Sequence, residues 1–559
     1  MKIPVITKYS KRYKRRQLSA MMRGYRVLRV NNLLQRIMDA QIALVEMPLG
    51  IPESKISRHL FGSTAKKANE AIRDFLITRV GHYSLNKSLL SSLGKKKGHV
   101  VHPLPKIWRR KIQSLGWQVS EIKSALVWHG FLFLCFSYGI FLLGKNILKG
   151  FYSSFLPGQK VLGKYVCFSG LTKNNLPQQI DDDSYETVSW YLQWQGRQAG
   201  IKTIGHNVKN VQEIKMKGVN IRFTDPLAPL RGFGKNCCLF VWGFSAACVC
   251  LVDWLKGRWW SSLMFAPCVQ AFIAKHQPTF AVDYLFPNSY SRKPLWLYEV
   301  EARGAKTSLY FYSTNCDSFK TKQGYQPTPA YYRNMNWSRY LVWDQEQVSF
   351  VCRSVESKAE IKIVGPIWSS ESTAVLPDLS SRTVGVFDIQ PRRKSIYEAL
   401  GVPLEYYTPA IGEKFLKDIH EVVGQKDLIM AWKGKRKLPS GKTRQLAKSF
   451  ESACKKMAAS RNILVIDPDI AATRLIKKCA LVISMPFTST ALIAKDLGKP
   501  SYYYDPSCLI QKDDRASHGI PIISGIDELR LILETALEKI KYKPADLCSR
   551  TMEFACDKS

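Results

Sequence analysis

The chain has 559 residues, enough for two α/β domains of about 200 residues each and an extension. Its 83 Lys and Arg residues outnumber the 44 Asp and Glu residues and give a formal net charge of +39. That charge predicts a polyanionic partner, namely nucleic acid, an anionic membrane surface or a charged substrate. The 14 Cys residues lie among apolar residues without the paired spacing of zinc ligands, which argues against a zinc module and indicates reduced thiols. We expect no metal ion and no cofactor.

Basic residues crowd the start of the chain, and no acidic residue occurs before Asp39. The arm contains Lys8, Lys11, Arg12, Lys14, Arg15, Arg16, Arg23, Arg26 and Arg29. It lacks the continuous apolar core that a secretory signal needs, so we expect a cytoplasmic protein. We assign residues 1–160 to a basic, mainly helical extension.

Two apolar stretches raise the question of membrane contact. Residues 125–144, between Lys123 and Lys145, are long enough to span a bilayer. Residues 236–252 are shorter and are predicted to be a buried core element. A single span would place the basic arm and the C-terminal half on opposite faces, against the positive-inside tendency. We therefore predict peripheral attachment at the inner face of the cytoplasmic membrane through a monotopic or re-entrant helix, aided by an anionic lipid surface. The alternative is a buried helix in a large soluble protein.

Strand and helix patterns alternate between residues 161 and 365. The segments VLGKYVCFSG, FAVDYLF and TSLYFY and the start of SRYLVWDQEQVSFVCRS read as apolar strands, and amphipathic stretches between them end at Gly200 and Gly304. This alternation is typical of βαβ units in a parallel sheet. Gly365 and Pro366 mark a linker, so residues 161–365 are predicted to form the first domain.

The same alternation returns in residues 366–559. The strand RTVGVFDIQP is followed by a helix from about Gly412, the strand KDLIMAWKGK, a helix, and the strand NILVIDPD. Two doubly wound Rossmann-like domains in tandem would face a central cleft at the carboxyl ends of their strands, where open α/β sheets bind ligands.

Residues 481–505 are the most informative segment of the chain. The run LVIS is typical of a buried parallel strand, and SYYYD supplies the next strand. Between them Pro486 and the hydroxyls of Thr488, Ser489 and Thr490 predict a helix start, and Gly498 predicts its end. The N–H groups of a first helical turn have no intrahelical partner, and the helix dipole favours an anion there, so this start suits a phosphate. The alternative is an ordinary capped helix.

These residues resemble a known family. The order of strand, IDPD, helix and CALVISMPFTSTALIAKDLGKPSYYYD resembles the donor half of GT-B glycosyltransferases, over residues 165–539. The tetrapeptide from Pro486 to Ser489 resembles the signature of bacterial polysaccharide-biosynthesis proteins named for their PFTS motif. The resemblance implies a GT-B fold, a nucleotide-sugar donor, catalysis without a tightly bound metal ion, and a glycan or lipid-linked acceptor held by the first domain.

The resemblance also implies donor-binding residues. By analogy with bacterial sialyltransferases, Thr488, Ser489 and Thr490 would hold the donor phosphate, with Ser484 below them. A CMP-activated acidic sugar fits that analogy, and a UDP sugar remains open. We take Pro486 and Phe487 as part of this donor-binding motif.

Further donor-side candidates follow two strands of the second domain. Lys433, Lys435 and Arg436 come at the end of one strand, where they would stabilise the leaving phosphate as its charge develops. The alternative is a solvated basic loop. Asp388 and Gln390 follow the first strand and would face the same cleft.

The first domain is expected to supply the general base. His206 follows a strand and therefore lies at a carboxyl edge, and its ordinary pKa suits proton transfer. Glu299 and Glu301, on a predicted helix, are the other candidates, although Glu299 could simply pair with Arg303.

Two other functions compete with sugar transfer. One is a CDP-alcohol phosphotransferase of teichoic-acid type, which would also release CMP. The other is a nucleic-acid-binding protein, suggested by the net charge. We expect no nucleic-acid partner, because the basic residues form no recognisable RNA- or DNA-reading module and the aromatic residues lie inside apolar strands.

Overall fold

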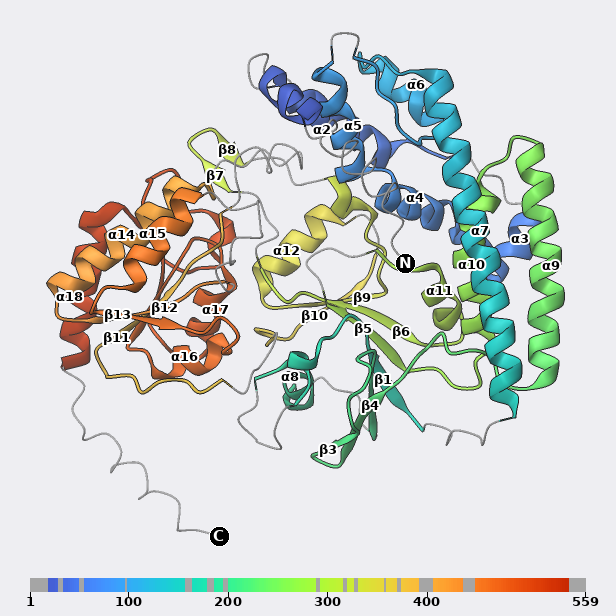
Figure 1. The fold of residues 1–559 in the computed structure, drawn as a ribbon. Helices are drawn as coiled ribbons and strands as arrows, with labels where there is room; N and C mark the ends of the chain where they lie inside the picture. Colours follow the sequence, from blue (N-terminus) through green and yellow to red (C-terminus); the bar gives the residue numbers. More distant parts are fainter. Residues whose placement is uncertain are drawn as a thin grey trace, which may run out of the picture.

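The computed structural model describes residues 19–28, 34–49, 55–95, 98–155, 163–177, 185–194, 200–287, 292–314, 319–325, 330–355, 358–368, 374–391, 406–435 and 448–541. The basic arm before residue 19 and Arg436 lie outside these residues. A helical region comes first, followed by two α/β domains (Figure 1).

The N-terminal region is helical, as predicted. Its elements are α2 (Leu34–Glu46), α3 (Lys55–Phe61), η1 (Gly62–Lys67), α4 (Ala68–Arg79), α5 (His82–Leu93), α6 (Lys106–Ser114) and α7 (Glu121–Ser154). Apolar residues of α4 and α5 join the same core as the first α/β domain, among them Ile72, Leu76 and Leu89. The extension is therefore packed onto that domain.

The first α/β domain contains an eight-stranded sheet in the order β10-β9-β6-β5-β1-β2-β4-β3. Its strands are β1 (Tyr165–Phe168), β2 (Thr203–His206), β3 (Ile214–Met216), β4 (Val219–Phe223), β5 (Asp283–Pro287), β6 (Lys306–Tyr310), β9 (Arg339–Val342) and β10 (Glu360–Ile363). All neighbours pair in parallel except β3 with β4. Its other elements are η2 (Lys173–Asn175), α8 (Thr187–Gln193), α9 (Phe233–Leu255), α10 (Trp260–His276), α11 (Leu295–Ala302), η3 (Ala330–Asn334), α12 (Gln345–Ser354) and the hairpin β7 (Lys320–Thr321) and β8 (Gly324–Tyr325).

The second α/β domain has a six-stranded parallel sheet in the order β13-β12-β11-β14-β15-β16. Its elements are β11 (Thr383–Phe387), α14 (Pro409–Gln425), β12 (Ile429–Lys433), α15 (Lys448–Ala458), β13 (Ile463–Ile466), α16 (Ala472–Lys478), β14 (Leu481–Ser484), α17 (Ser489–Asp496), β15 (Ser501–Asp505), η4 (Arg515–Ser517), β16 (Ile522–Ser524) and α18 (Gly525–Lys541). Relative to β11 as the first strand this is the order 3-2-1-4-5-6, which reverses direction between β11 and β14. A ligand of such a sheet is expected at that reversal, beyond the carboxyl ends of those two strands.

The prediction of two tandem doubly wound, Rossmann-like domains with a helical N-terminal region is confirmed. All four residues of β14 are buried, as expected for a strand covered on both faces of a parallel sheet. Gly498, the predicted helix stop, has a φ of +68°, a conformation that glycine adopts without strain. The predicted domain limits at residues 160 and 365 stay predictions.

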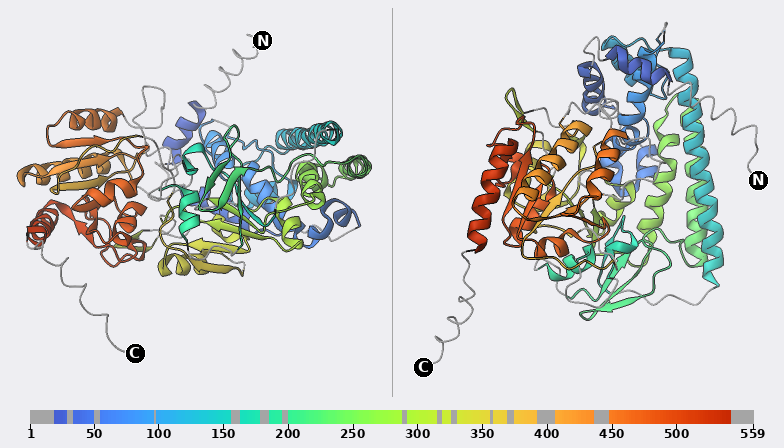
Figure 2. Two further views of the ribbon diagram at one scale, coloured as in Figure 1. Left: turned by 90° about the horizontal axis from the view of Figure 1, so that it is seen from below. Right: turned by 60° about the vertical axis from the view of Figure 1, so that its left-hand side comes forward.

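The prediction for residues 236–252 is wrong. They lie in α9, whose outer side is exposed, and only 33% of its most apolar window is buried. Helices α7 and α9 lie side by side at the edge of the molecule away from the second domain (Figures 1 and 2). Ser154 at the end of α7 accepts a hydrogen bond from Gly232 before α9, and Trp254 near the end of α9 donates to His129 in α7, so the pair is antiparallel. Hydropathy alone did not distinguish an outward apolar face from a core element.

Candidate donor-binding site

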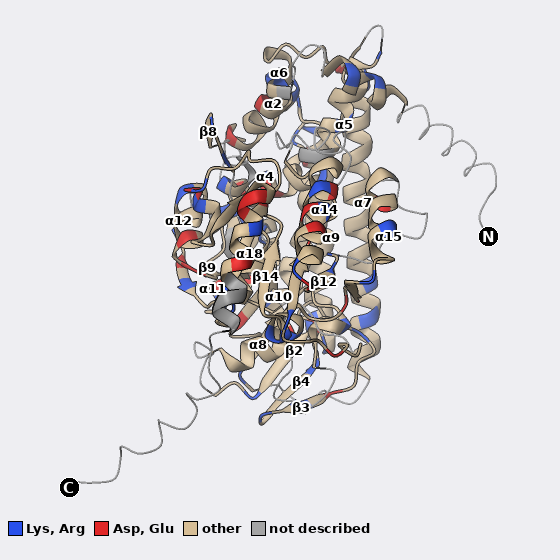
Figure 3. Cartoon of the chain, turned by 90° about the vertical axis from the view of Figure 1, so that its left-hand side faces the viewer, with Lys and Arg blue, Asp and Glu red and all other residues tan. Residues whose placement is uncertain are grey.

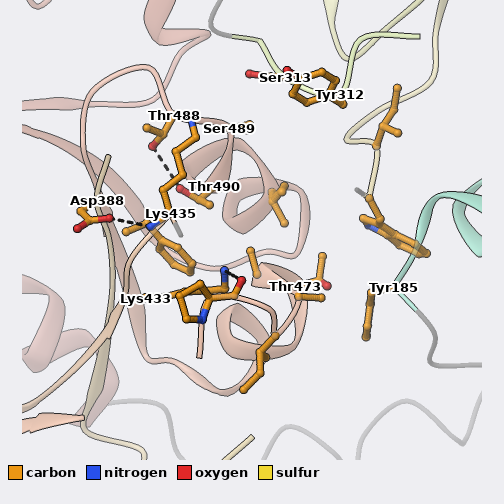
Figure 4. Close-up of a pocket in the computed structure, with 18 of the residues that line it drawn as sticks. Tyr185, Tyr312, Ser313, Asp388, Lys433, Lys435, Thr473, Thr488, Ser489 and Thr490 are labelled. Atoms are coloured by element: carbon orange, nitrogen blue, oxygen red, sulfur yellow. Dashed lines mark hydrogen bonds between the residues drawn. The ribbon is translucent and has the colours of Figure 1, made fainter. Parts of the chain in front are cut away.

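A cavity of about 290 Å³ lies between the two α/β domains. The first domain contributes segments that follow β6, β9 and β10, and the second contributes segments that follow β11, β12, β13 and β14. All of these are carboxyl ends of parallel strands, so the predicted cleft is present where the second sheet reverses direction. Figure 4 shows the side chains of the second domain on one side and Tyr185, Tyr312 and Ser313 on the other.

The start of α17 forms one end of this cavity, and Thr488, Ser489 and Thr490 line it. Thr488 is the N-cap residue, but its side chain makes no capping hydrogen bond to α17. Its hydroxyl instead donates to the carbonyl of Met485 at 2.8 Å. The hydroxyl of Thr490 lies 3.2 Å from the hydroxyl of Thr488 and 2.9 Å from that of Ser484. The hydroxyls of Thr488 and Thr490 are thus ordered by each other, and the N-cap side chain leaves the first-turn N–H groups uncapped.

A strained turn places this helix start. Phe487 has a φ of +60°, which is uncommon for a residue other than glycine. Its ring is buried and packs against Phe319 at a centroid distance of 4.9 Å and Tyr503 at 5.6 Å. Tyr407 donates a hydrogen bond to the carbonyl of Pro486. Pro486 and Phe487 therefore hold the turn and do not line the cavity. Ser484 is fully buried and does not line the cavity either.

Asp388 orders the loop that follows β12. One carboxylate oxygen accepts from the indole N–H of Trp432 at 3.1 Å, and the other accepts from the backbone N–H of Lys435 at 2.9 Å. Burial raises the pKa of Asp388 to about 7, although these two donors and Lys433 oppose the shift. Asp388 is the one carboxylate among the described residues that line the cavity. Its hydrogen bonds indicate that it positions Lys435.

Lys433 supplies a half-buried cation on the same side. Its ammonium donates to the carbonyl of Pro468 at 2.8 Å. Burial lowers the pKa of Lys433, and Asp388 opposes this shift. Lys435 is exposed at the rim. Both side chains line the cavity, whereas Gln390 does not.

The two predicted general bases lie outside the cavity lining. His206 ends β2 at a carboxyl edge, as expected, but it is fully buried and its Nδ1 accepts from the N–H of Val208. Burial lowers the pKa of His206. Glu299 is buried in α11, where its carboxylate faces Gly62 of the N-terminal region. Their catalytic roles stay predictions.

The first domain contributes an aromatic wall that the sequence did not reveal. Its members are Tyr185, Tyr312, Trp343 and Trp368. Tyr185 and Trp368 meet edge to face at 5.1 Å, and Lys477 of the second domain lies over the ring of Tyr185. These residues come from separate loops, so no local pattern groups them. One sequence signal could have indicated this wall: Trp343 is an aromatic residue that directly follows a strand, at the edge of the sheet where ligands bind.

Thr473 is a further residue that sequence reasoning missed. It lies in the first turn of α16 and lines the cavity. Its side chain is buried, and its hydroxyl has no hydrogen-bond partner among the described residues. A buried hydroxyl without a partner is uncommon and indicates a group that a ligand or water completes. Within the described ranges no cluster of three potential metal ligands is found, and metal-independent catalysis stays a prediction.

The fold resembles several solved structures at low sequence identity. They include TarM, at 11% identity and a TM-score of 0.26, covering 46% of this chain and 47% of TarM. A second is MnaA of S. aureus with UDP, at 8% identity and a TM-score of 0.33, covering 68% of this chain and 90% of MnaA. A third is the UDP-GlcNAc 2-epimerase of Methanocaldococcus jannaschii with UDP-GlcNAc and UDP, at 10% identity and a TM-score of 0.33, covering 68% of this chain and 94% of the epimerase. This chain spans about half the length of TarM.

No curated protein sequence matches the chain. A family model does match it. The family is described as "Polysaccharide biosynthesis PFTS motif protein", and its model covers residues 249–533, which include the whole second sheet and its Pro486–Ser489 motif. These residues make up more than half of the 559-residue chain, and the protein therefore belongs to the PFTS-motif family of polysaccharide biosynthesis proteins.

Proposed function

We propose that the protein is a glycosyltransferase that moves a sugar from a nucleotide-sugar donor to a growing surface polysaccharide or a lipid-linked acceptor. The observation that carries this proposal is the start of α17, whose hydroxyls open into a cavity between two domains. Family membership supplies the setting of polysaccharide biosynthesis. The donor is proposed to be a CMP-activated acidic sugar.

The phosphate is proposed to bind at Thr488, Ser489 and Thr490. First-turn N–H groups and the helix dipole favour an anion there, and the hydroxyl of Ser489 can donate a further hydrogen bond. The hydroxyl of Thr488 already donates to the carbonyl of Met485, so it would have to turn away from that carbonyl to donate to a phosphate. Lys433 lies on the same side and would stabilise the charge that develops on the leaving phosphate. The aromatic wall of Tyr185, Tyr312, Trp343 and Trp368 suits the flat faces of a base or a sugar ring.

In the proposed reaction an acceptor hydroxyl attacks the anomeric carbon of the donor. The bond between that carbon and the phosphate oxygen breaks, and the nucleotide leaves with the electron pair. Its negative charge is met by α17 and Lys433. The hydroxyl proton passes to a general base of the first domain. His206 and Glu299 stay the proposed residues, although both lie outside the lining of the donor cavity, and no divalent cation is part of the proposal.

Attachment to the inner face of the cytoplasmic membrane is part of the proposal. The outward side of α7 and α9, here called the apolar face, exposes large apolar residues. They are Ile122, Leu126, Val127, Phe133, Leu134, Tyr138, Ile140, Phe141, Leu148, Tyr152, Phe233, Phe240, Val241, Phe244, Leu251, Val252 and Leu255. In α7 no Lys, Arg, Asp or Glu occurs between Lys123 and Lys145, and its middle is free of blue and red in Figure 3.

The packing of α7 and α9 favours a helix pair that lies along the membrane surface. Their inward residues, such as Trp128, Leu132 and Leu239, belong to the core of the first domain. A Cβ on Gly139 would meet the ring of Phe265 in α10, and one on Gly243 would meet Leu143, so all three helices approach closely. A pair that crossed the bilayer would have to leave this core, whereas an in-plane pair keeps it.

Nucleotide binding tests the donor site. We would measure thermal stabilisation of the full chain by CMP, CDP, UDP, UMP and GDP, with Ser489→Ala and the control Ser452→Ala on the exposed side of α15. A nucleotide present at 100 times its dissociation constant should add about 2.7 kcal/mol. The proposal predicts stabilisation by a cytidine nucleotide that Ser489→Ala loses and Ser452→Ala keeps. If no nucleotide shifts the transition, α17 is only a helix start and the proposal fails. Product analysis separates sugar transfer from CDP-alcohol transfer, because the latter forms a phosphodiester.

A further inference from the structure

A second cavity, of about 590 Å³, lies where the N-terminal helices meet the first α/β domain. Its walls come from α4, from α11 and from the segment between η3 and β9. Ser338 and Lys358, which line it, precede β9 and β10, so the cavity lies at the amino edge of the first sheet. The donor cavity lies at the carboxyl edge of the same strands, and the two cavities share no lining residue.

Hydrogen bonds and ion pairs hold the walls of this second cavity. The ammonium of Lys293 lies 2.8 Å from the carboxylate of Glu301 and 4.0 Å from the ring centroid of Tyr298. The side-chain amide of Asn336 donates to the hydroxyl of Tyr298 and, at 3.4 Å, to Glu70. Because these side chains constrain one another, the cavity presents polar groups in fixed positions.

Four buried polar atoms on the walls nevertheless have no hydrogen-bond partner in the described part of the chain. They are Nε of Arg73, Oδ2 of Asp74, Nδ2 of Asn334 and Oδ1 of Asn336. Asp74 is only 4% exposed, and its other oxygen lies 3.8 Å from Arg292. Burial raises the pKa of Asp74 to about 7. Buried polar atoms usually have a partner, so four together indicate a site that something else completes.

The unpartnered atoms constrain the chemistry of the ligand. The nitrogens of Arg73 and Asn334 donate hydrogen bonds, whereas Oδ1 of Asn336 and, in the ionised carboxylate, Oδ2 of Asp74 accept them. Sugar hydroxyls do both, whereas an inorganic anion mainly accepts. The cavity also falls in the size range of small-molecule sites, about 300–1,000 Å³. Lys67, Arg333 and Lys358 are exposed at its rim. Lys67 pairs with Glu70 and Arg333 with Glu46, so Lys358 is the rim cation that forms no ion pair within the described residues.

We propose that this cavity binds an acidic sugar unit of a glycan, at a distance from the site of sugar transfer. The proposal rests on the proposed function in one respect, because it takes the ligand to be part of the polysaccharide that the protein extends. A glycan segment held at the amino edge of the sheet would anchor a long acceptor while its reacting end lies in the cleft between the domains.

The test uses the full chain and three probes: tetragalacturonate, its fully methyl-esterified form, and inorganic phosphate. Binding is measured by titration calorimetry on the wild type, Asn334→Leu, Lys358→Glu and Lys215→Glu. Asn334→Leu removes an unpartnered donor, which is expected to leave folding intact. Lys358→Glu reverses an exposed charge at the rim, and Lys215→Glu makes the same change on β3, away from the cavity.

We expect the wild type and Lys215→Glu to bind tetragalacturonate equally, and Asn334→Leu and Lys358→Glu to bind it at least 10-fold more weakly. The methyl ester and phosphate should each bind the wild type at least 10-fold more weakly than tetragalacturonate. Failure of the wild type to bind, equal binding by all variants, or equal binding of phosphate would overturn the inference. Nucleotide stabilisation of the same samples separates the two proposals: nucleotide binding without tetragalacturonate binding overturns this inference alone, and the reverse overturns the donor site alone.

Discussion

His518 of the second domain lies 2.6 Å from Asp344 of the first, Nδ1 to Oδ2. The other oxygen of Asp344 accepts from the N–H of Gln347 and caps α12. Neighbouring residues add contacts between the domains, because Asp514 accepts from the N–H of Lys320 and Arg515 lies over the ring of Tyr325. The segment 514–518 therefore forms an interdomain contact that sets the relative position of the two walls of the donor cavity.

The pair of His518 and Asp344 predicts a pH-dependent stability. Burial alone would raise the pKa of Asp344, but the hydrogen bond and charge of His518 lower it below its ordinary value. A carboxyl with a lowered pKa stabilises the fold above its unfolded value of about 4, and this contribution is lost as pH falls through the lowered value.

We expect His518→Asn to lose about 1 kcal/mol of unfolding free energy at pH 7, and the difference from the wild type to shrink below about pH 4. Asn suits this position because His518 has a φ of +51°, which Asn tolerates. Thermal unfolding of both proteins between pH 3 and pH 7 measures the effect. An equal difference at every pH would mean that the ion pair does not stabilise the domain contact.

Asp388 predicts the opposite pH trend. Burial raises its pKa to about 7, so its ionised form destabilises the fold above the ordinary pKa of Asp. The loss of unfolding free energy begins near the pKa of Asp in the unfolded chain, about 4, and is complete above the pKa of Asp388 in the folded protein. Asp388→Asn should therefore gain stability relative to the wild type, by up to roughly 4 kcal/mol, as pH rises from 4 to 8. The exposed Asp427→Asn is the control and should show no such trend. A constant difference for Asp388→Asn would refute a raised pKa.

Much of the fold follows from the sequence because each parallel strand carries its own local signal. The run from Leu481 to Ser484 is apolar and short, Gly498 marks a helix end, and both appear as predicted. The hydroxyls after β14 and the lysines at the end of β12 line the donor cavity, because the carboxyl ends of parallel strands meet at one edge. To apply this rule, one needs to know only which strands lie next to the point where the strand order reverses.

Other parts of the site depend on packing that no local pattern encodes. Phe487 belongs to the motif, yet its ring turns into the core to hold the turn. His206 lies at a carboxyl edge but on β2, which is on the side of β1 away from the strands that border the cavity. The exposed face of α9 could not be predicted either, because the helix carries apolar residues of its own on all sides.

Lys433 predicts how nucleotide binding changes with pH. Burial lowers the pKa of Lys433, so its charge is lost at a lower pH than that of an exposed lysine. A charge-assisted contact contributes about 1.5–3 kcal/mol, so Lys433→Met should weaken binding of the stabilising nucleotide by about 10-fold or more at pH 7. In the wild type the affinity should fall as pH rises above 7, at a pH lower than the ordinary lysine pKa of about 10.4, and Lys433→Met should lack this fall. The control Lys478→Met alters an exposed lysine of α16 outside the lining. Equal pH profiles for wild type and Lys433→Met would remove Lys433 from the donor site.

The apolar face of α7 and α9 predicts binding to lipid vesicles. Leu134, Phe141 and Phe244 are 63–67% exposed, so replacing all three by Ser changes little of the core. Each buried apolar side chain contributes about 1.5–3 kcal/mol, so the triple variant should bind vesicles at least about 100-fold more weakly. Co-sedimentation with phosphatidylglycerol vesicles measures this.

The control variant replaces Val465 and Leu531, exposed apolar residues of the second domain, by Ser. It should bind vesicles like the wild type, and both variants should keep the nucleotide-induced stabilisation. Because the chain carries a net charge of +39, binding to phosphatidylglycerol should fall with added salt by more than binding to phosphatidylcholine. If the triple variant binds vesicles as the wild type does, the apolar face of α7 and α9 does not contact lipid.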